Sequence, residues 1–287
     1  MKCKKCRKRF ALALTVCILI AVCFGVIFSH GEWWFPTVQS LRVYPAPRLT
    51  PLIETGALER WELSALSRMP NVTLSNTLLL VNSTHPLPKG YEALLEEYNG
   101  ARMHPLMVAQ YIALRDAVQE KTGVRIYVSS DYRTAEEQMQ ILAQSQDGIA
   151  AQLGCSEHEA GLALDVYAPY CAGEEFLRSP AGRLVNRICG EYGYIIRYPH
   201  GKEEITGISY EPWHLRYVGQ PHAQIMMESG LTYEEYLEFL GEGQWYRTGD
   251  YLICRQRPEE LALIYGWKEC HISPDNTGYL IVILKMA

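Results

Sequence analysis

Two short stretches of the sequence carry the side chains best suited to chemistry. The first places His158 and Asp165 seven positions apart around Gly161, and the second carries His214 with Glu211 three residues before it. Two imidazoles and two carboxylates are the inventory of a catalytic zinc site, which needs three N or O ligands, an open position for water and a spare carboxylate that moves protons. A lone His or Asp in a loop is usually a solvated surface group. Only the joint pattern therefore favours a metal site.

The stretch from Gly161 to Val166 has the alternation of a strand. If it is extended, Asp165 shares one face with Gly161 and Ala163, and the apolar residues between them share the other face. We expect the apolar face to pack on the core. The opposite face has almost no side-chain bulk before Asp165, so a metal and a substrate can approach the backbone there.

The second stretch should bend, because residues three apart do not share a face on a regular strand. Pro212 disfavours the helical region for Glu211, so a kink is expected that brings Glu211 close to His214. Trp213 would pack beneath the site as an apolar wall. On this interpretation Glu211 is a general base, which takes a proton from the attacking water and returns it to the leaving amine. The alternative is a surface Glu and a core His.

The elements that should position these residues precede them in the chain. Apolar residues at helical spacing predict a helix that ends at Gly123: Met107, Tyr111, Leu114 and Val118. Residues 124–128 then alternate as a strand. Thr134 followed by Glu137 has the form of a capping box, so a second helix should begin there and carry Gln138 in its second turn. Arg133 lies at the junction of strand and helix, where it can point into a cleft.

Three blocks of residues also carry a family resemblance. They are Ser129-Ser130-Asp131-Tyr132-Arg133 with Gln138; Ser156-Glu157-His158 with Gly161, Ala163 and Asp165; and the run from Ile205 through Glu211-Pro212-Trp213-His214 to Gly219. In this order they resemble the motif blocks of the VanY-type D-alanyl-D-alanine carboxypeptidases. The resemblance covers roughly Leu78 to Gly230. Asp131 departs from the family, which often has Gly before the Tyr-Arg pair.

The resemblance implies a Zn2+ enzyme that removes the terminal D-Ala from peptidoglycan pentapeptide stems outside the membrane. By position, the zinc ligands would be His158, Asp165 and His214. Glu211 would be the catalytic base, and Arg133 would stabilise the oxyanion that forms at the scissile carbonyl. The residues that would contact the substrate are Ser156, Gln138, Trp213 and Tyr132. By trimming D-Ala-D-Ala termini, such an enzyme would remove the target of glycopeptide antibiotics such as vancomycin.

The N-terminus predicts a membrane anchor. Residues 1–9 form a basic head, residues 10–28 are an apolar run long enough to span a bilayer as a helix, and aromatic residues follow. We therefore expect a single-pass protein of the cell membrane with a cytoplasmic N-terminus and an extracellular catalytic domain; a cleaved signal peptide is the alternative. Because the first ten residues hold six Lys and Arg and no acid, the remainder is more acidic than the net charge of −5 indicates. This argues against nucleic acid as a partner.

The rest of the chain completes an α+β prediction: a small mixed or antiparallel sheet with helices packed on one side, carrying the zinc site. Residues 29–75 are rich in Pro and predict an extracellular stalk or wrapping arm. We interpret residues 76–230 as the catalytic domain, which should begin with a strand at Thr77–Val81. Residues 231–287 predict an accessory helix at 232–240 and a small β extension with a hairpin at 273–278. Cys254 with Cys270 is the expected disulfide.

Neighbouring functions stay open on the sequence alone. A DD-dipeptidase or an LD-carboxypeptidase would differ in how far the cleft extends past the terminal residue of the substrate. A non-catalytic module that binds peptidoglycan peptides could keep the same scaffold and metal site. The presence of both Glu211 and Arg133 weighs against that last alternative, since a binding module needs neither.

Overall fold

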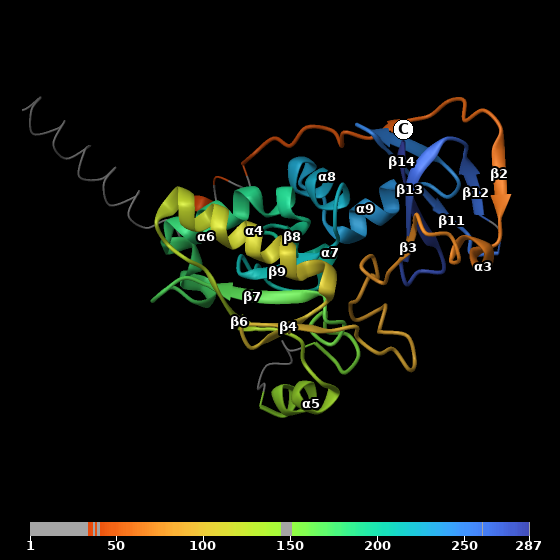
Figure 1. The fold of residues 1–287 in the computed structure, drawn as a ribbon. Coiled ribbons are helices and arrows are strands. Elements are labelled where there is room, and N and C mark those ends of the chain that lie inside the picture. Colours follow the sequence, from red (N-terminus) through yellow and green to blue (C-terminus); the bar gives the residue numbers. More distant parts are fainter. Residues whose placement is uncertain (1–33, 37, 39–40, 145–150, 260, 287) are drawn as a thin grey trace, which may run out of the picture.

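The computed structural model describes residues 34–36, 38, 41–144, 151–259 and 261–286. Two sheets organise them. A four-stranded sheet carries the predicted metal ligands, and we call it, with its helices, the four-stranded unit. A six-stranded sheet built largely from the C-terminal region lies beside it, at the right of Figure 1, and we call it the six-stranded unit.

The four-stranded sheet is antiparallel throughout. Its order is β6 (Tyr127–Ser130), β7 (Ala163–Tyr167), β9 (His214–Tyr217) and β8 (Tyr194–Ile196). The register places Asp165 of β7 opposite His214 of β9 and next to Ser130 of β6. Two residues from separate motif blocks therefore meet as direct cross-strand neighbours.

Helices cover one face of this sheet, as predicted. Helix α4 (Pro105–Thr122) and helix α6 (Pro180–Ile188) pack on the apolar face, while α5 (Ala135–Gln144) lies beyond the opposite face (Figure 1). The predicted ends of these helices are confirmed. Gly123 caps α4 with a φ of 73°, and Thr134 and Glu137 form the reciprocal hydrogen bonds of a capping box before α5.

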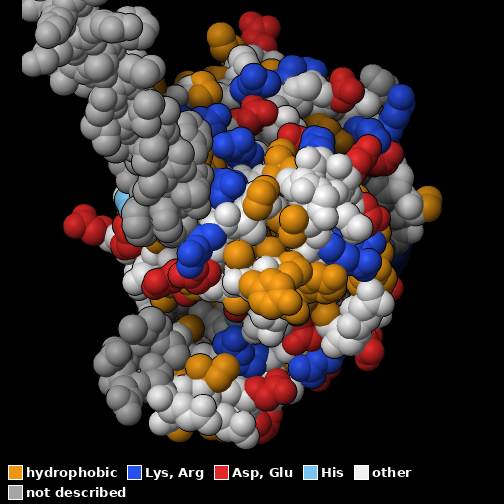
Figure 2. Space-filling view, turned by 90° about the vertical axis from the view of Figure 1, so that its left-hand side faces the viewer, with side chains coloured by type: hydrophobic (Ala, Val, Ile, Leu, Met, Phe, Trp, Pro, Cys, Tyr) orange, Lys and Arg blue, Asp and Glu red, His pale blue; other side chains and the backbone are white. Residues whose placement is uncertain are grey.

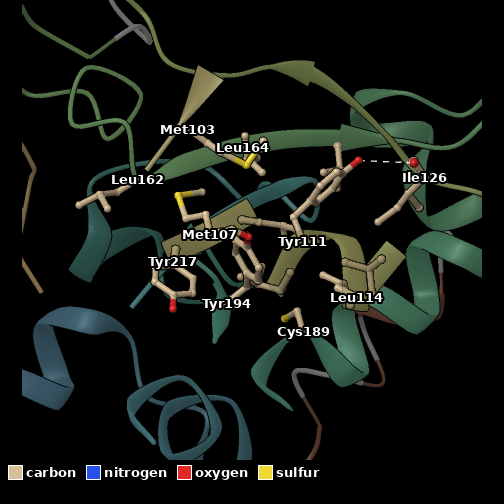
Figure 3. Close-up of a cluster of buried hydrophobic side chains, with 14 of the residues drawn as sticks. Met103, Met107, Tyr111, Leu114, Ile126, Leu162, Leu164, Cys189, Tyr194 and Tyr217 are labelled. Atoms are coloured by element: carbon tan, nitrogen blue, oxygen red, sulfur yellow. Dashed lines mark hydrogen bonds between the residues drawn. The ribbon is translucent and has the colours of Figure 1, made fainter. Parts of the chain in front are cut away.

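The core of the four-stranded unit follows the predicted alternation of β7. Leu162, Leu164 and Val166 are fully buried in one cluster with the apolar stripe of α4, drawn in part in Figure 3. Burying each such side chain stabilises the fold by about 1.5–3 kcal/mol. This packing fixes the rotation of β7, so Asp165 must point to the other face.

Shorter elements complete the unit. They are β4 (Glu96–Tyr98), β5 (Ala101–Met103), η1 (Gly173–Arg178), η2 (Cys189–Tyr192), α7 (Glu203–Thr206) and α8 (His222–Ser229). β4 and β5 form a hairpin, and the backbone carbonyl of Arg102 in β5 accepts a hydrogen bond from Tyr132 N. That bond ties the hairpin to the segment that follows β6.

The six-stranded unit is larger than the small extension predicted for residues 231–287. Its sheet has the order β1 (Thr50–Pro51), β10 (Trp245–Thr248), β11 (Tyr251–Gln256), β14 (Leu280–Met286), β13 (Trp267–Pro274) and β3 (Val72–Leu74). A separate pair joins β2 (Leu58–Trp61) to β12 (Leu261–Ile264), and α3 (Leu63–Leu66) and α9 (Tyr233–Phe239) flank the sheets. The predicted accessory helix and the hairpin between β13 and β14 are both present.

Strands from the predicted stalk or arm explain the larger size. β1, β2 and β3 lie between residues 50 and 74 and pair with β10, β12 and β13, so this segment wraps the C-terminal strands (Figure 1). The three strands are only two to four residues long. Such short pairings are set by the partner strand, and local sequence periodicity does not reveal them.

The segment Thr77–Val81 is wrongly predicted as a strand. All of its side chains are buried, but its backbone is irregular. Leu80 N donates to the backbone oxygen of Asp275, just after β13, and Leu78 N donates to the side-chain Oγ of Ser273. Leu79 lies in the core of the four-stranded unit and Leu78 in the core shared with the six-stranded sheet. The segment is therefore a wall between the two units.

Two further predictions are wrong or unsupported. Cys254 and Cys270 are both free, because they lie on β11 and β13 with β14 between them. Within the described ranges, no helix is long and apolar enough to cross a membrane. The predicted head (1–9) and anchor (10–28) fall outside those ranges. The described residues therefore give no support to the predicted N-terminal transmembrane helix or to the single-pass membrane location.

Figure 2 shows the end of the molecule at the left of Figure 1. Acidic and basic side chains are interspersed on this face around a group of hydrophobic side chains near its centre. Charges of opposite sign therefore lie close together across this surface.

Candidate metal centre

The three predicted ligands converge at one point of the four-stranded sheet. One atom each from His158, Asp165 and His214 lie within 4.8 Å of one another. His158 comes from the loop before β7, Asp165 from β7, and His214 is the first residue of β9. The His side chains are almost fully buried and the Asp side chain is one-fifth exposed, so the site opens to one side only.

Each imidazole has one nitrogen turned to Asp165 and the other anchored by an acceptor. His158 Nε2 lies 3.4 Å from Asp165 Oδ2, and its Nδ1 lies 2.8 Å from the backbone oxygen of Asp131. His214 Nδ1 lies 3.0 Å from Asp165 Oδ1, and its Nε2 lies 3.4 Å from Glu157 Oε2. Metal-binding histidines are commonly oriented in this way by an acceptor on the nitrogen that does not ligate.

A glycine makes the turn between His158 and β7. Gly161 has a φ of 70°, in the left-handed region, and its amide donates to His158 O. A Cβ at this position would lie 2.8 Å from Leu95 Cδ2 and 3.3 Å from Ala93 Cβ. The turn is thus available to glycine alone without displacing neighbours.

Glu211 lies beside the ligands without joining them. The chain turns at Pro212, as predicted, and Glu211 Oε2 comes within 3.7 Å of His214 Nδ1. Burial raises the pKa of the Glu211 carboxyl; the charge of His214 lowers it, and that of Asp165 raises it further. A carboxylate with a raised pKa is a better proton acceptor near neutral pH than an exposed one.

The acidic side chains around the ligand set favour positive charge at this site. Burial lowers the pKa of His214, but hydrogen bonds to Asp165 and Glu157 outweigh burial and raise it to about 10. Burial raises the pKa of Asp165, yet its hydrogen bonds to the two histidines hold it well below the usual range. A site that draws a proton onto an imidazole in this way suits a divalent cation, and two imidazoles with one carboxylate suit zinc. The residues present therefore fit the predicted metal.

A cavity of about 450 Å³ opens over these residues. It is lined by eight of the nine predicted site residues: Arg133, Gln138, Ser156, His158, Asp165, Glu211, Trp213 and His214. The Arg133 guanidinium donates to Gln138 Oε1 at 2.7 Å and to Ser130 Oγ at 3.1 Å. Gln138 in turn donates to the backbone oxygen of Ala151, so its amide holds Arg133 in place from α5.

Tyr132 is the predicted site residue that the structure does not bring into this cavity. Its ring lies under the guanidinium of Arg102, 5.2 Å from centroid to Cζ, and lines a neighbouring cavity instead. Asp131 is also directed to Arg102, since its carboxylate accepts from the Arg102 amide and lies 3.6 Å from Nε. The charge of Asp131 is thereby shared with Arg102.

Sequence reasoning gave no role to Glu157, although the residue belongs to the second motif block, and it missed Tyr198. Tyr198 lines the cavity, and its ring lies 4.9 Å from that of His214. Glu157 is completely buried against His214, Arg197 and Arg216. The available signal was two arginines, Arg197 directly after the apolar run of β8 and Arg216 within β9, because a buried arginine requires an acidic partner.

Two imidazoles, a carboxylate ligand and a spare carboxylate at the rim of a cavity are the arrangement of a metal-dependent hydrolase. Comparison with known proteins narrows this class. Residues 100–220 match the family VanY, D-alanyl-D-alanine carboxypeptidase. The chain is 37% identical to the bifunctional D-Ala-D-Ala dipeptidase and carboxypeptidase VanXYC of Enterococcus gallinarum, over 58% of this chain and 96% of that protein. It is 30% identical to a D-alanyl-D-alanine carboxypeptidase of Enterococcus faecalis, over 79% of this chain and 88% of that protein.

Solved structures agree with the sequence matches. The vancomycin resistance D,D-dipeptidase VanXYg, in complex with a D-Ala-D-Ala phosphinate analogue, is 27% identical with a TM-score of 0.61, covering 80% of this chain and 100% of that one. A VanY D,D-pentapeptidase variant in complex with Zn(II) is 35% identical with a TM-score of 0.50, and the match covers 56% of this chain and 98% of that one. The chain belongs to the VanY family of D-alanyl-D-alanine carboxypeptidases.

Proposed function

We propose that this protein is a zinc-dependent D,D-carboxypeptidase that removes the terminal D-Ala from peptidoglycan stem peptides. The observation that carries the proposal is the convergence of His158, Asp165 and His214 with Glu211 at their side. Relatives named for D-Ala-D-Ala hydrolysis, one of them solved with Zn(II), support both the substrate and the metal.

The ligand roles follow from the orientation of each ring. His158 Nε2, an Asp165 carboxylate oxygen and His214 Nδ1 would hold the ion, since the other nitrogen of each ring contacts an acceptor outside the site. Bound zinc supplies a Lewis acid that lowers the pKa of water and polarises the scissile carbonyl.

Glu211 would perform the proton transfers. Its carboxylate accepts a proton from the attacking water as the new C–O bond forms, and returns it to the amine nitrogen of the leaving D-Ala as the C–N bond breaks. The raised pKa of this buried carboxyl matches such a role. The Glu211 carboxylate is ionised again at the end of each cycle, so the net reaction consumes one water molecule.

Arg133 would stabilise the oxyanion at the scissile carbonyl. Its guanidinium is preorganised by Gln138 and Ser130, so little reorganisation is needed when the charge develops. Ser156 and Gln138 line the same cavity and would help to hold the terminal carboxylate of the substrate. Trp213 contributes an apolar wall to the same cavity.

Two related activities define the alternatives. The relative VanXYC is named as both dipeptidase and carboxypeptidase, and the solved relative LdcB as an LD-carboxypeptidase. Relatives from vancomycin resistance also favour a role in glycopeptide resistance. Cells that lack the protein should then contain more pentapeptide and tolerate less vancomycin.

One assay separates these activities. Purified full-length protein loaded with zinc is given a pentapeptide ending in D-Ala-D-Ala, free D-Ala-D-Ala, and a tetrapeptide ending in L-Lys-D-Ala. We expect D-Ala release from the pentapeptide, its loss with a chelator, and its loss in Glu211→Ala. Release from the tetrapeptide alone would instead favour the LD-carboxypeptidase, and release from no substrate would favour a non-catalytic module.

A further inference from the structure

A buried network of charges lies directly behind the metal ligand His214. At its centre is Glu157, whose side chain is 0% exposed. Glu157 Oε1 accepts from Arg197 Nε at 2.7 Å and from Arg216 Nη1 at 2.9 Å, and Oε2 faces His214 Nε2 at 3.4 Å. We call Glu157, Arg197, Arg216 and Glu234 the buried charge network.

The network extends into α9 of the six-stranded unit. Glu234 accepts from Arg197 through two hydrogen bonds, Nη1 to Oε2 at 2.9 Å and Nη2 to Oε1 at 2.5 Å. The Arg197 side chain is 0% exposed and that of Glu234 17%. Two acids and two arginines balance in charge, so each guanidinium depends on its carboxylates to remain buried.

The remaining donor group of Arg216 points away from the site. Its Nη2 donates to the backbone oxygens of Thr77 at 3.0 Å and Leu79 at 2.6 Å, in the wall between the two units. Its Nε donates to Tyr217 O. Hydrogen bonds to backbone oxygens thus hold Arg216 in place, and hydrogen bonds to Glu157 and Glu234 hold Arg197.

This arrangement decides which nitrogen of His214 carries the hydrogen. Glu157 Oε1 accepts from both arginines and its Oε2 faces His214 Nε2, so this contact places Nε2 as the donor and the carboxylate oxygen as the acceptor. Nδ1 is then the nitrogen that faces Asp165 at 3.0 Å, and it is the one that would bind a metal in place of a proton. The position of Glu157 is in turn set by Arg197 and Arg216.

We propose that Glu157 is a positioning residue that fixes the orientation and tautomer of His214, and that Glu234 of α9 locks it through Arg197. The C-terminal region is then part of the metal-binding unit, although Glu234 lies beyond the residues 100–220 that match the family. The inference rests on the metal site of the proposed function.

A purely structural role would give a different result. Loss of a buried ion pair destabilises the fold wherever it lies, and that alone would lower Tm without changing the affinity of the folded protein for zinc. A positioning role lowers zinc affinity even in protein that remains folded. Outer-shell partners of metal-binding histidines typically change affinity by about 10–100-fold.

The test uses the full chain with Glu157→Gln, Glu234→Gln and the control Glu238→Gln. Glu238 is exposed on the same helix α9, so its replacement removes one charge from that helix without touching the network. Zinc affinity is measured by competition with a chromogenic chelator, and Tm of the metal-free protein by circular dichroism. We expect about 10–100-fold weaker binding for Glu157→Gln, a smaller loss for Glu234→Gln, and no change for the control.

The outcomes separate this inference from the proposed function. Folded Glu157→Gln and Glu234→Gln proteins that bind zinc as tightly as the wild type would overturn it, whatever their Tm. If Glu157→Gln does not fold, Glu234→Gln decides, because its side chain lies at the edge of the network. A wild type that binds zinc tightly but hydrolyses no peptide would defeat the proposed function and leave this inference standing.

Discussion

Replacing Glu211 with Gln keeps the shape of the side chain and removes the carboxylate that we assign to proton transfer. Glu211 Oε2 lies 3.7 Å from His214 Nδ1, beside the three ligands and outside their cluster. The variant should therefore bind zinc as the wild type does, but lose its base. Positioned general bases contribute about 10²–10⁴-fold to rate, which corresponds to about 3–5 kcal/mol of transition-state stabilisation.

The assay measures kcat for D-Ala release from the pentapeptide together with zinc affinity. A matched control is Glu136→Gln, which removes an exposed carboxylate from α5, the helix whose Gln138 lines the cavity. We expect kcat to fall by at least 10²-fold in Glu211→Gln and to stay unchanged in the control. Two results refute the reasoning: a loss of kcat below tenfold, or a parallel collapse of zinc affinity that makes Glu211 a ligand.

Three further predictions concern other parts of the structure. Arg133→Lys should lower kcat by about 10²–10³-fold, because an ammonium cannot keep both the Gln138 contact and the oxyanion contact; steady-state kinetics with little change in KM would agree. Burial lowers the pKa of His222 to about 3 and of His271 to about 4. Both imidazoles are therefore neutral in the folded protein near neutral pH, whereas in the unfolded chain they take up protons below about pH 6.5. The free energy of unfolding should thus fall between pH 7 and pH 5 by about 2 kcal/mol per histidine, and urea unfolding at both pH values would show it. If the His222→Gln protein loses as much stability between these pH values as the wild type does, His222 is not the source of its share. Gly161→Ala should cost about 1–3 kcal/mol, because the residue has positive φ and its Cβ would clash with Leu95; a thermal melt that matches the wild type would rule this out.

Local patterns predicted much of the four-stranded unit. The apolar alternation before Asp165 fixed which face of β7 is buried, and the capping signals fixed the ends of α4 and α5. Such features depend on neighbours within a few residues, so they can be read from one sequence. The three ligands and Glu211 were predicted for the same reason, as short spacings within two motifs.

The wider organisation could not be predicted in this way. The strands β1, β2 and β3 are too short to show periodicity and exist through pairing with strands some 200 positions later in the chain. Cys254 and Cys270 shared a region but are kept apart by β14. Tyr132 belonged to a motif block, yet its neighbour Arg102 comes from a separate hairpin and holds it outside the cavity.

The sequence by itself determined the chemistry available to this protein: two histidines, two carboxylates and an arginine in segments whose local structure directs them to one face. Tertiary structure alone decided how that chemistry is held. Glu157 stood in a motif block without a role until the fold showed it buried between Arg197, Arg216 and His214. A buried charge requires partners from distant segments, and no local pattern encodes which ones arrive.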